Sequence, residues 1–397
     1  MIRILLIILI ILIILLLCAG CIAPPSATEP ASTAQTTPTS MPPSTYTDPP
    51  ETTEVTVPPT TEAPPDPLEV MVSEMTLEEK VGQLFLARCP EANATEDIQT
   101  YHLGGYILFG RDFDGQTPES LRAILSEYQN ASAIPLLIAV DEEGGTVNRV
   151  SSNTAFRSRK FNSPRNLYQS GGLDSILMEE AEKCALLTSL GINVNLGPVC
   201  DIATDPNAFM YPRSLGENKD ITSRYTEAVV SLMGDYDLGS CLKHFPGYGN
   251  NPDTHTGIAV DSRSLEELEG KDLLPFAAGI EAGCGAILVR HTIVEALDEN
   301  LPASLSPAVH QYLRNTMGFS GVILTDDLVM QAITDTYGAG EAAVLAVLAG
   351  NDLLCSTEYM VQYESVLAAV LSGRIDIDTL NNAVRNVLEW KTELGLI

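Results

Sequence analysis

The sequence predicts an α/β fold for residues 68–397, a single (β/α)8 TIM barrel, and three observations lead to this prediction. Short aliphatic and β-branched runs alternate with longer segments in which apolar residues recur at helical spacing. There are eight such short runs, and most are continuously apolar, as in parallel strands that are covered on both faces. Polar residues cluster at the carboxyl ends of these runs, where active sites of such barrels form. An open doubly wound sheet is the alternative arrangement.

The expected elements follow in order along the chain. Thr76 and Glu79 have the spacing of a capping box and predict a helix that opens the domain. The expected strands are 81–87, 104–110, 135–141, 192–199, 239–245, 285–291, 321–327 and 351–356. The expected helices are 118–130, 175–190, 221–237, 264–282, 306–317, 339–349, 358–372 and 377–394. The first strand is the most ambiguous, because the pattern over 77–86 also fits one continuous helix.

The first 67 residues are expected to lie outside the barrel. An unbroken aliphatic run, 4–17, follows Arg3 and precedes Ala-Gly-Cys21, which is typical of an export signal and resembles a bacterial lipoprotein signal. We therefore expect residues 1–21 to be a lipoprotein signal peptide whose lipobox makes Cys21 the lipid-bearing residue. An ordinary secretory signal or an uncleaved anchor is the alternative. Residues 22–67 are rich in Pro, Thr and Ser without Lys or Arg, which predicts a disordered, extended linker.

Composition narrows the possible partners and compartment. The 22 basic and 52 acidic residues give a net charge of −30, which argues against nucleic acid or an anionic membrane surface as a partner. The cysteines after residue 68 are widely spaced and lack a CxxC pair, so we expect buried thiols rather than disulfides or a zinc site. We expect a monomer without metal or cofactor, held by its lipid at the extracytoplasmic face of the cell membrane.

The seventh expected strand runs into two acids in GVILTDDLVM, residues 321–330. An Asp that leaves a buried strand is held rigidly and faces the barrel mouth, which suits a nucleophilic carboxylate. An acid that caps the following helix is the alternative, and two acids allow both roles. We assign the chemistry to Asp326 and the loop or cap role to Asp327.

A possible proton donor follows the fifth strand in KHFPGYGNNPDTHTG, residues 243–257. Retaining glycoside hydrolysis needs a nucleophile and a separate acid/base group. His255 has a side chain that titrates near neutral pH, and Asp253 can orient its imidazole. Taken alone, the pair also fits a plain polar surface loop. If it is catalytic, loop 246–257 must close and reopen during turnover, so we expect it to be mobile.

Several further polar residues at strand ends are candidate sugar ligands. Lys243 is expected to be nearly buried and therefore to need a partner, either a sugar hydroxyl or an Asp. The full set is Asp141 and Arg149 in VDEEGGTVNR, Arg213 in YPRSLGEN, Lys243 and His244 after strand five, and His291 after strand six. Each of these also fits a structural ion pair, which is the commoner fate of such residues.

Four motifs in one order, DEEGGTVNR, PRSLGE, KHFPGYGNNPDTH and LTDDLVM, resemble glycoside hydrolase family 3. The resemblance runs from about residue 70 to the C-terminus and is greatest to single-domain bacterial β-N-acetylglucosaminidases. It implies a TIM barrel that removes a terminal β-linked N-acetylglucosamine through a covalent glycosyl-enzyme, with net retention. By matched position it makes Asp326 the nucleophile and His255 the acid/base, oriented by Asp253. The matched sugar-binding residues are Asp141, Arg149, Arg213, Lys243 and His244.

The sequence departs from the family pattern at three positions that bear on the aglycone side. Tyr248 replaces a usual His, Thr146 replaces an Arg in EGGRV, and Arg290 replaces a small residue. The loop to Asp253 is also one residue shorter. We expect Arg290 to favour an anionic neighbour, such as a lactyl carboxylate or a phosphate.

The sequence therefore predicts a retaining exo-β-N-acetylglucosaminidase that acts on peptidoglycan fragments. A β-N-acetylglucosaminide phosphorylase on the same scaffold is one alternative. A lipid-anchored protein that binds wall sugars after losing catalysis is another. A metal-dependent barrel hydrolase is disfavoured, because the chain has five histidines and no HxH near the first strand.

Overall fold

The computed structural model describes residues 66–216, 218–251 and 258–397. The chain divides into two compact units, residues 1–62 and 63–397, and every described residue belongs to the second. The predicted signal peptide with Cys21, and the predicted linker up to residue 65, lie outside the described residues. Asp253 and His255 lie outside them as well.

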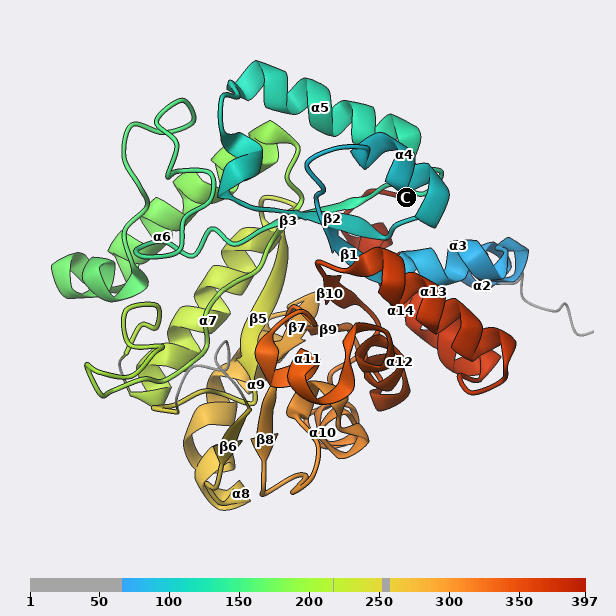
Figure 1. Cartoon of the computed structure of the whole chain (residues 1–397). Helices are drawn as coiled ribbons and strands as arrows, with labels where there is room; N and C mark the ends of the chain where they lie inside the picture. The colour runs from blue at the N-terminus through green and yellow to red at the C-terminus, as the bar shows by residue number, and fades with distance from the viewer. Residues whose placement is uncertain (1–65, 217, 252–257) are drawn as a thin grey trace, which may run out of the picture. The chain divides into compact units, whose positions relative to one another are not determined.

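Eight parallel strands form the centre of the domain (Figure 1). They are β1 Phe85–Arg88, β2 Gly105–Leu108, β3 Leu137–Val140, β4 Val194–Asn195, β5 Gly239–Phe245, β7 Ala286–Val289, β9 Val322–Thr325 and β10 Leu354–Ser356. They are hydrogen-bonded in the order β10-β1-β2-β3-β4-β5-β7-β9. A parallel bridge between Leu324 and Leu353 then joins β9 to β10 and nearly closes the barrel. The TIM-barrel prediction is confirmed, and each predicted strand overlaps one of these eight.

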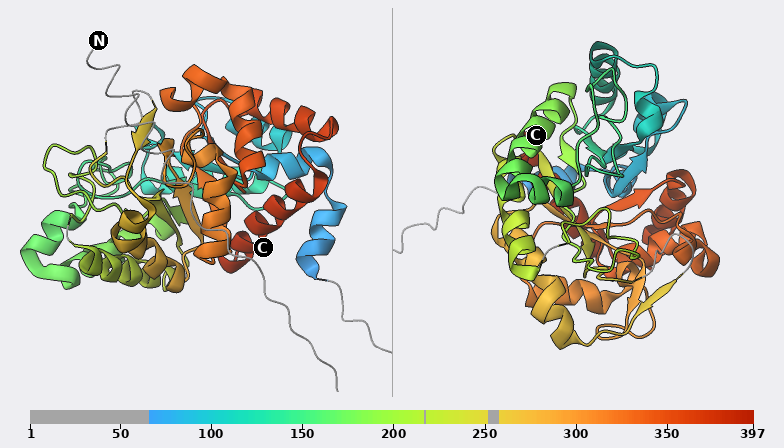
Figure 2. Two further views of the ribbon diagram at one scale, coloured as in Figure 1. Left: turned by 90° about the horizontal axis from the view of Figure 1, so that it is seen from below. Right: turned by 90° about the vertical axis from the view of Figure 1, so that its left-hand side faces the viewer.

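Helices surround the strands, as the further views show (Figure 2). The main ones are α2 Pro67–Glu74, α3 Leu77–Gln83, α4 Ala94–Tyr101, α5 Pro118–Ala131, α6 Pro164–Leu190, α7 Lys219–Gly234, α9 Leu273–Glu281, α10 Pro307–Gln311, α11 Gln331–Tyr337, α12 Ala339–Ala349, α13 Tyr359–Leu371 and α14 Ile377–Glu393. A short helix, α8 Leu265–Glu267, continues through a π-helical turn into α9. In the described part of the chain, no helix has the length and apolar character needed to span a membrane.

The beginning of the barrel differs from the predicted strand 81–87. Helix α3 extends to Gln83, and β1 begins only at Phe85. The predicted capping box is present: the Glu79 amide donates to Thr76 Oγ1, and the Thr76 amide donates to Glu79 Oε2. Sequence analysis did not predict α2, α4, α11 or a small parallel sheet formed by β6 Ala259–Asp261 and β8 Thr292–Val294.

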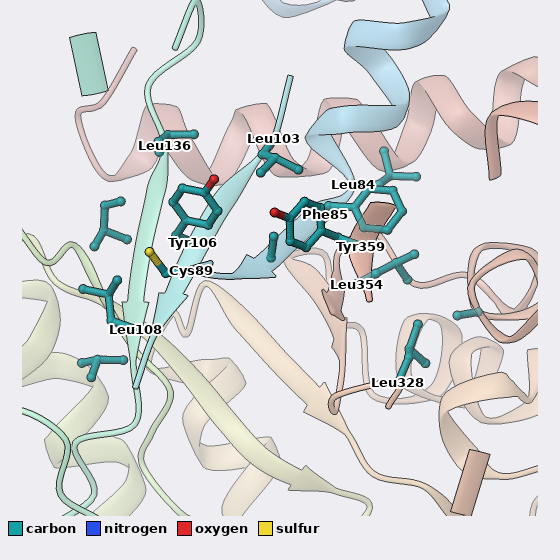
Figure 3. Packing of buried hydrophobic residues seen from close by; sticks show 14 of the residues in the cluster. Leu84, Phe85, Cys89, Leu103, Tyr106, Leu108, Leu136, Leu328, Leu354 and Tyr359 are labelled. Atoms are coloured by element: carbon teal, nitrogen blue, oxygen red, sulfur yellow. The ribbon is translucent and has the colours of Figure 1, made fainter. Parts of the chain in front are cut away.

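Alternating residues of each strand divide the core into two layers. In β1, Phe85 and Ala87 belong to the cluster that packs against the helices, whereas Leu86 belongs to the cluster inside the barrel. Figure 3 shows part of the outer cluster, including Phe85 of β1 and Tyr106 of β2. The Tyr106 hydroxyl donates to the Ala94 carbonyl at 2.9 Å and so fastens α4 to the barrel. The six described cysteines are all free and buried, as predicted.

The amino end of the barrel is closed by the C-terminal helix α14. Its Trp390 lies in the same cluster as the inward-facing strand residues. A Cβ added to Gly285 would lie 1.9 Å from Trp390 Nε1, and one added to Gly239 would lie 3.0 Å from Trp390 Cζ2. Glycine at the entry to β5 and β7 therefore makes room for the indole. With this end filled, the opposite end is the one that can hold a site.

Candidate active site

A cavity of about 560 Å³ opens at the carboxyl ends of the strands. Its polar lining includes most of the predicted site residues: Asp141, Arg149, Arg213, Lys243, His244 and Asp326. Phe109, Leu196, Leu288 and Met330 are among the apolar residues that complete the wall. The cavity combines an apolar wall with a few convergent polar groups, which is the usual character of a small-molecule site.

Lys243 is the centre of the charged cluster. It is 1% exposed, and its Nζ lies 2.5 Å from Asp141 Oδ1 and 2.7 Å from Glu143 Oε1. Burial alone would lower the pKa of Lys243, but the two carboxylates raise it above the usual lysine value. The ammonium is therefore kept charged, and it holds Asp141 at the edge of the cavity.

Glu143 joins Lys243 to Arg213. Arg213 donates to both carboxylate oxygens, from Nε at 2.9 Å and from Nη2 at 2.6 Å. Burial would raise the pKa of Glu143, but Arg213 and Lys243 together bring it well below the usual range. A bidentate pair of this kind fixes the plane of both groups. Glu143 was not among the predicted site residues, although it follows Asp141 closely in DEEGG.

His244 is held between Asp201 and Arg213. Its Nδ1 lies 2.8 Å from Asp201 Oδ2, and its Nε2 lies 3.2 Å from Arg213 Nη2. Because the carboxylate can only accept and the guanidinium can only donate, this network assigns the proton to Nδ1 and the lone pair to Nε2. Burial would raise the pKa of Asp201, but its hydrogen bond with His244 lowers it. Asp201 was not among the predicted site residues.

A local irregularity lets neighbouring residues of β5 face the same cavity. Consecutive side chains of a regular strand point to opposite faces. The pairing of β5 with β7 shifts register between Lys243 and Phe245. Both Lys243 and His244 line the cavity. A bulge that redirects a side chain beside a site is a recurrent feature of sheets.

The loop after β3 is folded around Glu142. This carboxylate is fully buried and accepts hydrogen bonds from the amides of Arg149 and Val150, each at 2.7 Å. The loop thereby turns back and places Arg149 in the cavity wall, with Nη2 3.9 Å from Asp141 Oδ2. Gly144 has a φ of 95°, and a Cβ there would lie 2.2 Å from the Asn162 carbonyl oxygen, so this turn requires glycine.

Asp326 and Asp327 have different surroundings at the end of β9. Asp326 lines the cavity, and its Oδ1 accepts from the Asp327 amide at 2.9 Å. Asp327 Oδ1 accepts from the amides of Val329 and Thr357, and its Oδ2 accepts from Thr357 Oγ1 at 2.5 Å. Both residues line the cavity, and Asp327 in addition joins two loops.

Two residues that were expected to contact substrate or an anion lie outside the cavity wall. His291 is fully buried, with Nδ1 2.7 Å from Ser304 Oγ and Nε2 3.1 Å from the Asp327 carbonyl oxygen. It lies behind the Asp326–Asp327 turn and is not part of the cavity wall. Arg290 is also fully buried, and its Nη2 lies 2.6 Å from Asp261 Oδ2. The anionic neighbour of Arg290 is thus a residue of the protein itself.

The other two departures from the family pattern lie on the cavity wall. Thr146 is exposed there. Tyr248 is 1% exposed, and its ring meets the His244 ring edge-on, with the centroids 5.3 Å apart. The Tyr248 amide also donates to Asp201 Oδ1 at 2.6 Å. Across the described ranges, no group of three or more His, Cys, Asp or Glu side chains is arranged to hold a metal ion.

Sequence comparison relates this chain to known proteins. The model of the glycosyl hydrolase family 3 N-terminal domain matches residues 76–390. A β-hexosaminidase of Nitrosomonas eutropha is 30% identical over 301 residues, which cover 71% of this chain and 84% of that protein. The β-hexosaminidase LpqI of Mycobacterium tuberculosis is 29% identical over 330 residues, which cover 79% of this chain and 82% of that protein.

A solved structure of the same family also matches this chain. A glycoside hydrolase family 3 β-N-acetylglucosaminidase from Paenibacillus sp. strain FPU-7 matches with a TM-score of 0.75 at 32% sequence identity. The match covers 81% of this chain and 63% of that one, so this chain spans less than two thirds of that protein.

Proposed function

The chain belongs to glycosyl hydrolase family 3 and is a glycosidase, and on this premise we propose that it is a retaining exo-β-N-acetylglucosaminidase. The proposal rests mainly on the Asp326 carboxylate, which lines the same cavity as the cluster of Lys243, Asp141, Glu143 and Arg213. The substrate class comes from the names of the similar proteins, which are β-hexosaminidases and a β-N-acetylglucosaminidase.

In the proposed first step, a carboxylate oxygen of Asp326 attacks the anomeric carbon of the terminal sugar. His255, oriented by Asp253, gives its proton to the glycosidic oxygen, and the aglycone leaves as an alcohol. In the second step His255 takes a proton from water, whose oxygen attacks the same carbon and releases Asp326. Two displacements give net retention. The Asp327 amide supports this role, because its hydrogen bond restrains the orientation of the Asp326 carboxylate.

The charged cluster is proposed to hold the sugar. Asp141 accepts from sugar hydroxyls while Lys243 and Arg149 stand on either side of its carboxylate. Lys243, Arg213, Arg149 and His244 complete the ring of polar contacts in the cavity wall. Because Glu143 and Asp201 fix three of these groups before substrate arrives, little side-chain entropy is lost on binding.

Turnover of 4-nitrophenyl N-acetyl-β-glucosaminide by the full-length protein tests the proposal. We expect release that is much faster than from the plain β-glucoside and unaffected by phosphate or a chelator. Asp326→Ala and His255→Ala are expected to reduce kcat, Asp326→Ala by on the order of 10⁴-fold or more, as for other covalent catalysts. Asp378→Ala, at an exposed acid in the first turn of α14, is the matched control and leaves kcat unchanged.

Other outcomes of this assay separate the alternatives. Release that increases with phosphate and yields a sugar phosphate identifies a phosphorylase. Binding of N-acetylglucosamine without any turnover, unchanged in Asp326→Ala, identifies a sugar-binding protein. Either result contradicts the hydrolase.

We also propose that the enzyme acts on peptidoglycan fragments from the extracytoplasmic face of the membrane, anchored through lipid on Cys21. The support is the aliphatic run before Cys21 and the Pro/Thr/Ser-rich segment after it. Cys21→Ser is expected to move the protein from the membrane fraction to the soluble fraction. Unchanged fractionation would contradict the anchor without affecting the assignment of the activity.

A further inference from the structure

A network of four charged side chains, three of them buried, lies beside the segment that follows β5. Asp261, at the end of β6, is fully buried, and its Oδ2 accepts from Arg263 Nη2 and from Arg290 Nη2, each at 2.6 Å. Arg263 Nη1 lies 2.9 Å from Asp272 Oδ2, and Asp272 is 2% exposed. Two arginines and two aspartates are therefore joined in one network, in which Arg263 is the member that reaches solvent.

Arg263 connects the beginning of segment 246–261 to its end. Its Nη2 donates to the Gly247 carbonyl at 2.7 Å, while its Nε donates to Asp261 Oδ1 at 2.9 Å. The chain passes so close that a Cβ on Gly249 would lie 2.6 Å from Arg263 Nη1. A guanidinium offers several donors in one plane and can reach these acceptors together, whereas a lysine ammonium on its flexible stem cannot.

Arg290 links the network to the cavity. Its guanidinium carbon lies 4.6 Å from the centroid of the Tyr248 ring. Tyr248 in turn touches His244 through its ring and Asp201 through its amide. The network is therefore in contact with the cavity wall, although neither Arg263 nor Arg290 lines the cavity.

We propose that Arg263, with Asp261 and Arg290, is a positioning residue for proton transfer, because it fixes both ends of the segment that includes Asp253 and His255. This inference rests on the proposed function. A largely buried ion network adds little stability over apolar residues of the same volume, but it fixes the geometry of the chain segments that it joins. Arg263 acts through the segment and does not touch the reacting atoms.

Two substrates with different leaving groups test the inference in the full-length protein. Dinitrophenolate leaves without protonation, whereas the second sugar of an N-acetylglucosaminyl disaccharide needs a proton from the acid. We expect Arg263→Lys to lower kcat/KM for the disaccharide about tenfold or more and to change that for the dinitrophenyl glycoside less than about threefold, since general acid catalysis typically contributes about 10²–10⁴-fold. His255→Ala provides the reference: its ratio of kcat/KM for the dinitrophenyl glycoside to kcat/KM for the disaccharide is the ratio expected when the acid is lost completely.

Arg314→Lys is the matched control. Arg314 has the same side-chain exposure as Arg263, 25%, and also bonds an Asp, Asp352, together with backbone carbonyls. Its carbonyl partners belong to Phe319 and Gly321, which precede β9 at the amino end of the barrel. We expect the ratio of the two kcat/KM values to be unchanged in this variant.

The possible results of this experiment either support or overturn the positioning role of Arg263. Equal losses on both substrates in Arg263→Lys, or no loss on either, overturn the positioning role and leave the proposed activity intact. Wild-type protein without activity, or His255→Ala with no dependence on the leaving group, refutes the proposed function first and the positioning role with it. If Arg263→Lys does not fold, Gly249→Ala displaces the same guanidinium with all four charges kept, and the same selective loss is expected.

Discussion

Lys243 and Lys391 are both buried, at 1% and 0% exposed, but they lie at opposite ends of the barrel and have different partners. Lys243, at the carboxyl end, lies within 2.7 Å of two carboxylates. Lys391, at the amino end, donates to the amide oxygen of Gln83 at 2.7 Å. The carboxylates outweigh burial and raise the pKa of Lys243, whereas burial lowers the pKa of Lys391 to about 7.

The surroundings of the two lysines explain this difference. Around Lys243, loops from several strands contribute charged groups to one cavity. Next to Lys391, Trp390 packs among apolar residues inside the barrel. A buried cation is therefore not by itself evidence of a site. The partners of the cation distinguish the two cases. Paired charges beside a cavity can contact a ligand, whereas a single buried charge in a packed core is destabilising, and the surrounding packing offsets this destabilisation.

Of the substitutions at the two ends of the barrel, Lys243→Met is expected to have the largest combined effect on stability and activity. The change leaves Asp141 without its short contact and removes one of the two cations beside Glu143. We expect unfolding in urea to show a loss of about 3 kcal/mol, the lower end of the cost of breaking a buried pair, because Arg213 still compensates Glu143. We also expect kcat/KM to fall at least about 100-fold, as for removal of one preorganised donor. Retained kcat/KM despite lost stability would make the cluster structural.

A large effect confined to stability is expected from Trp390→Ala. Removing the indole leaves a cavity between α14 and the first residues of β5 and β7, and such substitutions cost about 3–5 kcal/mol. Because this site is at the end opposite the cavity, kcat/KM measured well below the melting temperature should equal that of the wild type. Trp390→Phe fills more of the space and should lose less stability. A change in kcat/KM for either variant would show that the two ends are coupled.

The same contrast explains what the sequence could predict. A buried strand appears in the sequence as a short local run of apolar residues. All eight strands of the barrel were therefore predicted, with errors only in their boundaries. The first boundary was wrong because residues 81–83 carry apolar and neutral side chains that fit either a strand or the end of α3. Helix α4 was missed because its eight residues contain few apolar positions to show a period.

Site residues that lie at strand ends within a recognisable motif were found in the cavity, as Asp141, Lys243 and Asp326 show. Glu143 was missed because its importance comes from partners 70 and 100 positions away, Arg213 and Lys243, and no local pattern records such pairing. His291 was expected in the cavity because it follows a strand, but its ring points into the protein toward Ser304. Position at a strand end predicts nearness to a site and does not predict side-chain direction.

The smallest expected effect is a pH dependence of stability that arises from Lys391 and not from Lys243. The pKa of Lys391 is lowered from 10.5 to about 7, so between these values the unfolded chain binds more protons than the native protein. Lys391 should therefore contribute a rise in stability with pH in this window, by at most about 1.4 kcal/mol per pH unit, and no slope below it. The buried cysteine thiols, whose pKa values are raised by burial, contribute a slope of the opposite sign, and they do so equally in the wild type and in Lys391→Met. Urea unfolding at several pH values from 7 to 9 should therefore show a more positive slope in the wild type than in Lys391→Met. Lys243 has a raised pKa, so it stays protonated through the window and its loss in Lys243→Met should leave the slope unchanged. Equal slopes in the wild type and Lys391→Met would show that Lys391 is charged in the native protein and has an ionic partner.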